Sequence, residues 1–325
     1  MLLGVPSVGV DFRYGPAVHD RSVILTMRFS LAQSVVSDLL ADGTLSRSDT
    51  VLAVCAGERE HELFSNHNFE HVVISNIGEQ QQNNWSPACS WSYQDAQSLS
   101  YADSSFDFTF VADGLHHCQS PHGAMLEMYR VARKGIIVIE SRRSLLMQVA
   151  NRLGLSPEYE VEAVVGSELA RGGVNNTAVP NYIYRWTEGE LKRTIRSYDP
   201  RGRHHFRFFY ELNLPYELAD WKRTKFRLNA VRIVDPLVQA LTRVFKKQCN
   251  TLAMVVLKPV IPRDLWPWLT VEGGEVVFNA AYADRHFEPI DTIKSRYSQQ
   301  EQDTRAAPGQ GAAGRVHRED RRSSR

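Results

Sequence analysis

The chain has 325 residues, 43% of them hydrophobic, and a formal net charge of +1 at pH 7. This length suits one large α/β domain with extensions or two small domains, and the near-neutral charge excludes a globally basic nucleic-acid binder. The four cysteines are scattered and form no CxxC spacing, which argues against a disulfide or zinc framework. No apolar run approaches the length of a membrane span, and the amino-terminal residues lack the charged region of a signal peptide. We therefore expect a cytoplasmic protein.

The amino-terminal part of the chain predicts the beginning of an α/β domain. Apolar side chains recur at helical spacing over residues 30–43. Short apolar runs at 51–54 and 72–75 are typical of buried strands, with a polar, helix-compatible stretch between them. Residues 78–92 are rich in Gln, Asn and Ser and are predicted to form a loop, and 93–96 to form a short third strand.

The most informative stretch follows at 106–139. Residues 106–111 form an apolar, partly aromatic run that predicts a buried strand. Pro121 suits the first turn of a helix, which is predicted to continue to residue 134 and to end at Gly135. A second continuous apolar strand is predicted at 136–139. Strands that are apolar on both faces and joined by a helix indicate a parallel sheet covered on both sides.

Beyond residue 140 the predicted elements are less regular. A helix is expected at 145–153, and 156–186 is interpreted as an irregular insertion because it contains paired glycines, paired asparagines and a proline. Thr187 and Glu190 stand at capping-box spacing, so a helix should begin there. The remaining predictions are a strand at 206–212, a helical region at 217–247 that Pro236 kinks or splits, a strand at 251–257 and a hairpin around 273–274.

Four segments carry a resemblance to a known family: VLAVCAGER, YQDAQSLSYADSSFD, FDFTFVADGLHH and EMYRVARKGIIVIE. With these segments the chain resembles a class I S-adenosylmethionine-dependent methyltransferase, of the kind called methyltransferase type 11. The resemblance covers residues 51–140 closely and 187–258 by architecture. It implies a Rossmann-like α/β sheet, mostly parallel with a closing antiparallel strand, and helices on both faces.

The expected domain organisation follows from this resemblance and from composition. Residues 1–28 should form an amino-terminal arm and 29–260 the methyltransferase domain, in which the insertion at 156–186 builds the acceptor or cap region. Residues 261–298 are an expected carboxyl-terminal extension. Residues 299–325 hold almost no apolar side chains and are predicted to be a disordered tail.

The resemblance implies that S-adenosylmethionine binds at the ends of the first four strands. Cys55, Ala56 and Gly57 correspond to the family's glycine-rich turn, which here keeps one glycine. Asn76 stands where an acidic residue usually accepts hydrogen bonds from the ribose, and an uncharged acceptor should bind more weakly. The other residues implied to contact the cofactor are Ile77, Asp95, Ala96, Asp113 and Gly114.

The acceptor side is less defined. His116 follows the fourth strand and is a candidate general base, because histidine titrates near neutral pH. His117 is a candidate substrate contact, together with Arg201, Arg203 and Arg207, which alternate with aromatic residues and would suit a phosphate or carboxylate. The alternative interpretations are a histidine that packs the turn and a solvated outer face. No metal is expected, because His117, Cys118 and His122 have no matching ligand set elsewhere.

These patterns predict methyl transfer to an oxygen or nitrogen of a small molecule or glycan precursor, such as a nucleotide-linked sugar. An alternative is an inactive methyltransferase-like protein that serves as a binding or scaffold partner. A nicotinamide-dependent oxidoreductase is a third class, but the chain lacks the GxGxxG turn. No nucleic-acid partner is expected, because no RNA-binding module accompanies the arginines.

Overall fold

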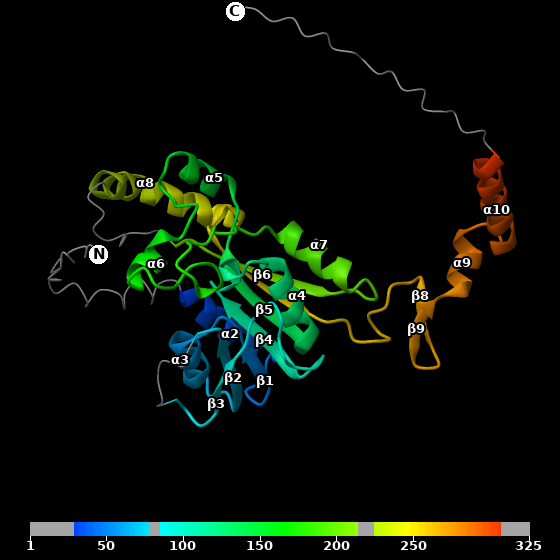
Figure 1. The fold of residues 1–325 in the computed structure, drawn as a ribbon, viewed down its shortest axis with the longest axis horizontal. Helices are drawn as coiled ribbons and strands as arrows, with labels where there is room; N and C mark the ends of the chain where they lie inside the picture. The colour runs from blue at the N-terminus through cyan, green and yellow to red at the C-terminus, as the bar shows by residue number, and fades with distance from the viewer. Residues whose placement is uncertain (1–28, 79–84, 214–223, 307–325) are drawn as a thin grey trace, which may run out of the picture. The chain divides into compact units, whose positions relative to one another are not determined.

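The computed structural model describes residues 29–78, 85–213 and 224–306. The chain divides into two compact units, of which the first ends at Asp264 and the second begins at Leu265 (Figure 1). The first unit contains the seven-stranded sheet, and the second contains a separate two-stranded sheet. The predicted boundary at 28 falls directly before the described residues, whereas the one at 298 lies within the described range.

The large sheet has the strand order β3-β2-β1-β4-β5-β7-β6. Its strands are β1 (Thr50–Ala53), β2 (His71–Asn76), β3 (Cys89–Tyr93), β4 (Phe106–Ala112), β5 (Ala132–Ser141), β6 (His205–Glu211) and β7 (Thr251–Leu257). All neighbours are parallel except β7, which is antiparallel to both β5 and β6. The predicted α/β class and the mostly parallel sheet are confirmed. Because β7 runs antiparallel to both of its neighbours, β6 points the same way as β5.

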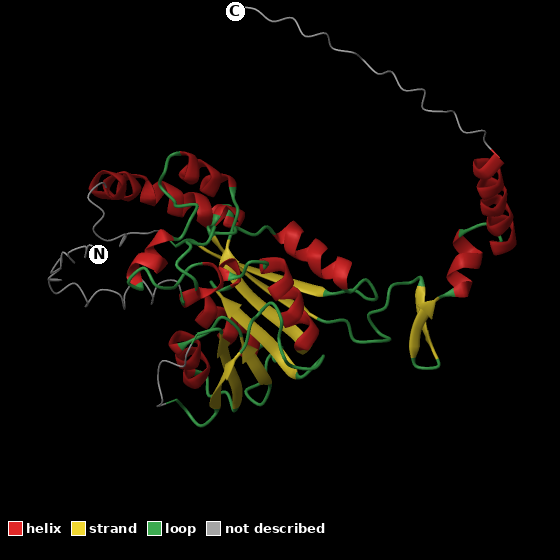
Figure 2. Cartoon of the chain, in the orientation of Figure 1, coloured by secondary structure: helices red, strands yellow, loops and turns green. Residues whose placement is uncertain are grey.

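Helices cover both faces of this sheet (Figure 2). On one face, α2 (Ser30–Ala41) and α3 (Glu58–Asn66) bury apolar side chains such as Val35 and Phe64. On the other face, α4 (Pro121–Val131) and α7 (Glu188–Tyr198) bury Met128 and Ile195. Successive strand residues alternate between the two cores, since side chains of a strand point to opposite faces. This double burial explains why the strands are continuous apolar runs.

The third strand differs from the prediction. It lies at Cys89–Tyr93, inside the predicted loop, and residues 93–96 largely follow it. β3 pairs with β2 in register from Val72 opposite Cys89 to Asn76 opposite Tyr93. Trp91 packs edge-to-face on Trp85, with ring centroids 5.8 Å apart. Two large aromatic side chains thus anchor a stretch that has no periodic apolar pattern.

The boundary between α4 and β5 also differs. The helix was predicted to run to residue 134, but it ends at Val131 and β5 begins at Ala132. Arg133 and Lys134 therefore lie in the strand, where Arg133 pairs with Asp107 at 2.6 Å and Lys134 pairs with Asp49 at 2.5 Å. These ion pairs at the amino ends of the strands hold the two basic residues in the sheet.

Two excursions leave the sheet at its carboxyl edge. The first lies between Arg142 and Trp186, which form a parallel bridge that closes it, and contains α5 (Leu145–Arg152) and α6 (Val161–Gly166). The second lies between β6 and β7 and contains α8 (Thr224–Val244), which is not split at Pro236. Arg142 pairs with Glu188 at the start of α7, at 2.9 Å. The predicted insertion at 156–186 falls within the range of the first excursion.

The second unit contains β8 (Leu269–Glu272), β9 (Glu275–Phe278), α9 (Ala280–His286) and α10 (Ile290–Ala306). Gly273 and Gly274 have φ of 59° and 89°, and so make the tight turn of the predicted hairpin. α10 extends past residue 299, where the disordered tail was predicted to begin, because its Gln, Glu and Arg residues favour a helix. The rest of that tail and the predicted arm lie outside the described residues. Within the described ranges, no helix has the length and apolar composition needed to cross a bilayer.

Candidate functional site

The carboxyl ends of β1 and β4 meet where the strand order reverses direction. β1 is followed by β2 on one side, and β4 by β5 on the other. Open α/β sheets bind their ligands in the crevice at such a switch point. Cys55 and Asp113 follow these two strands, and both have a φ of 51°. Gly114 lies so close to Cys55 that a Cβ atom on Gly114 would be 2.6 Å from the Cys55 Cβ, so only glycine fits there.

The turn after β1 is tied to the end of β2. The Ala56 amide donates to the Ser75 carbonyl at 2.9 Å, and Asn76 Nδ2 donates to the Ala56 carbonyl at 3.2 Å. The Ile77 amide donates to Asn76 Oδ1 at 2.8 Å. The Asn76 amide group therefore supplies both a donor and an acceptor, and its orientation is fixed by these two partners. These contacts bring together three of the predicted cofactor residues, Ala56, Asn76 and Ile77.

Gly57 borders open space. A Cβ atom built on it would meet nothing within 4 Å among the described residues. Its φ of −157° is extended backbone that any residue adopts. This glycine is therefore not required by the local backbone or by packing in the protein itself.

Glu60 is a residue of this site that the sequence analysis missed. Its Oε2 accepts a hydrogen bond from the Gly57 amide at 2.7 Å, while its Oε1 is buried with no hydrogen-bond partner among the described residues. Burial raises the pKa of this carboxyl group, and the charge of Asp113 adds to the effect. The signal in the sequence was the spacing of Gly57 and Glu60, which is that of a capping box.

Asp95 and Ala96 lie in the turn after β3, at the same edge of the sheet. Asp95 is exposed, and its Oδ1 accepts a hydrogen bond from the Gln97 amide at 2.9 Å, while Ala96 is buried. The Asp95 carboxylate therefore caps its own turn. Because β3 ends beside β2, this turn lies on the far side of Asn76 from β1.

His116 lies between two carboxylates in a short 3₁₀ turn at Leu115–His117. Its Nδ1 is 2.9 Å from Glu140 Oε2, and its Nε2 is 3.2 Å from Glu160 Oε2. Burial lowers the pKa of this imidazole, but the two carboxylates outweigh burial and raise it well above the ordinary value. Both ring nitrogens of His116 therefore face carboxylates, and its role as a general base stays a prediction.

The predicted arginine patch lies elsewhere. Arg201 and Arg203 precede β6. The first residue of β6, His205, pairs with Leu257 of β7, which in turn pairs with Gly135 in the amino-terminal half of β5. The two arginines therefore lie at the edge of the sheet where the parallel strands begin. Arg201 pairs with Asp199 at 2.8 Å, and Arg207 pairs with Asp42 at 2.5 Å. These positions and pairings favour the alternative interpretation, a solvated outer face. The direction of β6 decides the matter, and no local pattern in the sequence reports it.

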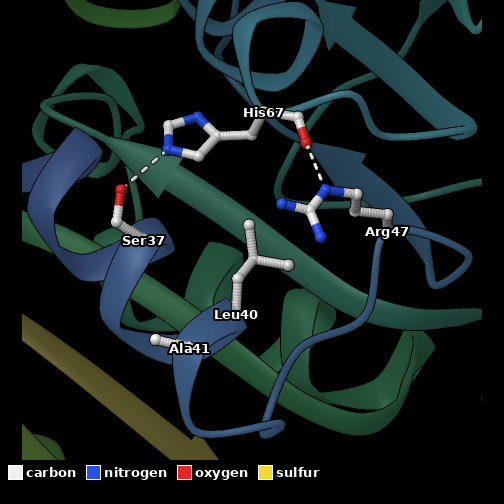
Figure 3. A pocket seen from close by; sticks show the side chains of 5 residues that line it. All are labelled: Ser37, Leu40, Ala41, Arg47 and His67. Atoms are coloured by element: carbon white, nitrogen blue, oxygen red, sulfur yellow. Dashed lines mark hydrogen bonds between the residues drawn. The ribbon is translucent and has the colours of Figure 1, made fainter.

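A surface hollow of about 340 Å³ also lies away from this site (Figure 3). It is lined by Ser37, Leu40 and Ala41 of α2, by Arg47 before β1 and by His67 after α3. His67 Nε2 is 2.9 Å from Ser37 Oγ, and Arg47 Nε donates to the His67 carbonyl at 3.0 Å. Because Arg47 lies at the amino end of β1 and these polar groups pair with one another, the hollow is not part of the candidate site.

Comparison with known proteins agrees with this geometry. Residues 55–139 match a family model described as a methyltransferase domain. The match spans the turn after β1 through β5, on a sheet with a switch point and one antiparallel strand. Residues 55–139 of the chain therefore contain a methyltransferase domain. No curated protein matches the sequence.

Several solved structures are similar to this chain at low identity. One is a possible histamine N-methyltransferase from Thermotoga maritima, with 14% identity, a TM-score of 0.38, and coverage of 74% of this chain and 97% of that one. Another is magnesium protoporphyrin IX methyltransferase from Synechocystis PCC 6803 with bound SAH, with 14% identity, a TM-score of 0.44, and coverage of 73% and 86%.

Proposed function

We propose that the protein transfers the methyl group of S-adenosylmethionine to an oxygen or nitrogen of a small molecule, with the cofactor lying over the turn at Cys55–Gly57. The observation that carries this placement is the open space beside Gly57 at the switch point of the sheet. A glycine that neither the backbone conformation nor packing requires is expected where a ligand approaches the backbone. The glycan-precursor alternative rested on the arginine patch and loses that support.

The residues around this turn fit the cofactor's charges. S-adenosylmethionine carries a sulfonium and an ammonium group, both positive. Glu60 Oε1 is buried and unpartnered among the described residues, next to the Gly57 amide. A buried carboxylate oxygen without a partner is costly, and a cationic group of the ligand would satisfy it. Asn76 and Ile77 would face the ribose, Asp95 and Ala96 the adenine, and Asp113 and Gly114 the transferring end.

The chemistry asks mainly for positioning. The methyl group is activated by the positive sulfur that carries it, and it moves to the acceptor by in-line displacement. Holding the acceptor atom close and aligned supplies much of the rate enhancement. The residues of this chain therefore act by binding the cofactor, orienting the acceptor and excluding water.

The two excursions at the carboxyl edge would build the acceptor side. They expose many large apolar side chains, which favours an acceptor with an apolar part. These side chains are Leu145, Val149, Leu153, Tyr159, Val161, Val165, Leu169, Val179, Tyr182, Ile233, Leu237, Leu241, Val244 and Phe245.

Calorimetric titration with S-adenosylmethionine tests the placement. Gly57→Val should fold normally, because its backbone is extended and its surroundings are open, but should lose cofactor binding. Gly189→Ala on α7 is the matched control, since a methyl group there meets only the flexible Arg193 side chain at 3.4 Å. Unchanged affinity in Gly57→Val contradicts the placement. A wild-type protein that binds no cofactor favours the alternative, an inactive methyltransferase-like binding protein.

A further inference from the structure

A cluster of metal-ligating side chains lies beside the proposed methyl-transfer site. His116 and His117 follow β4, and Glu160 comes from the excursion after β5. His116 Nε2 and His117 Nε2 lie 3.2 Å and 3.3 Å from the same atom, Glu160 Oε2. The three ligating atoms all lie within 4.8 Å of one another. Two imidazoles and a carboxylate thus converge from segments far apart in the chain.

The spacing of these atoms suits a transition-metal ion. A zinc ion binds histidine nitrogen and carboxylate oxygen at about 2.0–2.2 Å, so two ligand atoms on a tetrahedron lie about 3.4 Å apart. The two distances to Glu160 Oε2 agree with that edge length. Three protein ligands of this kind, with a fourth position open, form a common catalytic metal site.

Residues behind the cluster are arranged as the second layer of a metal site. Glu140 is buried, and its Oε1 accepts hydrogen bonds from the Gly114 amide at 2.9 Å and the Leu115 amide at 2.6 Å. Its Oε2 is 2.9 Å from His116 Nδ1, which directs Nε2 toward Glu160. A histidine ligand usually donates its other nitrogen to a carboxylate in this way.

Glu160 is held from the other side. Asn181, which is 2% exposed, donates through Nδ2 to Glu160 Oε2 at 3.2 Å. Glu140 and Glu160 together bring two negative charges to one poorly solvated cluster, and a divalent cation would neutralise both. The side chains of His117 and Glu160 keep 32% and 26% of their exposure, so solvent or a substrate can reach the ligating atoms.

We propose that His116, His117 and Glu160 bind a divalent first-row transition-metal ion, with Zn²⁺ as the reference ion. The open coordination position would hold the oxygen or nitrogen of the methyl acceptor beside Asp113 and Gly114. This acceptor role rests on the proposed function, whereas metal binding itself does not. The site predicts an acceptor that coordinates metal ions, such as a hydroxyl, phenol or amine.

Metal content and cobalt spectroscopy on the full-length protein test this proposal. The protein is stripped with a chelator, loaded with Zn²⁺ and desalted, and bound metal is measured by mass spectrometry. We expect one equivalent per chain. Co²⁺ should substitute and give visible absorption bands of a low-symmetry nitrogen and oxygen site.

Variants assign the ligands. His117→Ala and Glu160→Gln should each weaken Zn²⁺ binding by about tenfold to a hundredfold and abolish the Co²⁺ bands. His122→Ala is the matched control, because His122 is a nearby histidine that bonds to Glu190 and lies outside the cluster. Circular dichroism monitors folding, and the wild-type stoichiometry decides the case if a variant unfolds.

The alternative is that the same contacts form only a charged hydrogen-bond network. Wild-type protein without stoichiometric Zn²⁺, or Zn²⁺ affinity unchanged in both His117→Ala and Glu160→Gln, overturns the proposal. Titration of the same samples with S-adenosylmethionine separates the two proposals. Cofactor binding without metal binding overturns the metal site alone, and metal binding without cofactor binding overturns the proposed function alone.

Discussion

At the scale of single residues, Glu60 is expected to affect both the stability of the fold and cofactor binding. Its Oε1 is buried without a partner among the described residues, and burial raises its pKa. A carboxyl group whose pKa is raised in the folded state favours folding while protonated. This contribution to stability is lost as the pH rises from the ordinary pKa of the carboxyl group through its raised pKa in the folded state. At neutral pH Glu60 therefore lowers the free energy of unfolding.

Glu60→Gln should consequently be more stable than the wild type at pH 7 to 8, by about 1 kcal/mol or more, with the difference shrinking toward pH 4. The same change should weaken S-adenosylmethionine binding, because the cation loses its charged partner. Urea denaturation at several pH values and calorimetric titration measure the two effects. Glu62→Gln, an exposed position on the same helix, is the control. If Glu60→Gln is less stable than the wild type at neutral pH, the ionised Glu60 carboxylate stabilises the fold and the expected gain is contradicted.

Asn76 gives a second test, in which the structure reverses a simple expectation. An acidic residue at this position would accept ribose hydrogen bonds more strongly. Yet Asn76 Nδ2 donates to the Ala56 carbonyl at 3.2 Å, and an aspartate cannot donate that bond. In Asn76→Asp, a carboxylate oxygen would face the Ala56 carbonyl oxygen, and the repulsion between the two oxygens would disturb the turn that holds Gly57.

We therefore expect Asn76→Asp to weaken cofactor binding about tenfold, the effect of losing roughly 1.4 kcal/mol. Calorimetric titration measures this, with Asn68→Asp in the turn before β2 as the control. Tighter binding in Asn76→Asp would mean that the ribose contact outweighs the bond to Ala56.

At the scale of elements, Asp107 fastens three strands at the amino edge of the sheet. Its Oδ2 accepts hydrogen bonds from the Thr50 amide and hydroxyl of β1 at 3.1 Å and 3.0 Å. Its Oδ1 pairs with Arg133 of β5 at 2.6 Å. Burial alone would raise the pKa of Asp107, but hydrogen bonds from Arg133, Thr50 and Lys134 lower it to about 2.

An acid with a lowered pKa stabilises the fold above its ordinary pKa and loses this effect as the pH falls through the folded value. Asp107→Asn should therefore cost about 1–2 kcal/mol at pH 7, a range reduced because Arg133 is half exposed. The cost should fade between pH 4 and pH 2 in denaturation experiments. Asp103→Asn, which removes an exposed carboxylate paired with Arg130, is the control. An equal loss at pH 2 and pH 7 contradicts the assigned charge.

At the scale of the whole molecule, the second unit forms its own small sheet and helices from Leu265 onward. The elements that carry the candidate site all belong to the first unit. A chain that ends after Pro267, and so keeps the buried Leu265, should bind S-adenosylmethionine with unchanged affinity and melt at the same temperature as the main transition of the full chain. Calorimetry on both proteins checks this, and a clear loss of melting temperature would show that the second unit supports the first.

Much of the architecture could be read along the chain. The strands β1, β4, β5 and β7 are buried on both faces over most of their length, so apolar residues dominate their central parts. Pro121 begins α4, and Thr187 caps α7, accepting a hydrogen bond from the Glu190 amide at 3.2 Å. The third strand was missed because Trp85 and Trp91, rather than a periodic pattern, anchor it.

The chemistry at the carboxyl edge was only partly readable. The family resemblance located the turn at Cys55–Gly57 and the residues after β4. It did not reveal that Glu60 turns back onto Gly57, or that Glu160 reaches His116 across 44 positions of sequence. The interpretation of Arg201 and Arg203 as acceptor contacts came from their own spacing beside aromatic residues, and the strand that follows them begins at the opposite edge of the sheet.

The sequence by itself determined most of the elements, the parallel α/β class and the resemblance to methyltransferases, because burial on two faces, helix capping and short motifs are local properties of the chain. The tertiary structure decided the direction of β6, the partners of His116 and the unpartnered oxygen of Glu60. These depend on which distant segments pack together, and the packing energy that selects them is shared over the whole core rather than written in any one stretch.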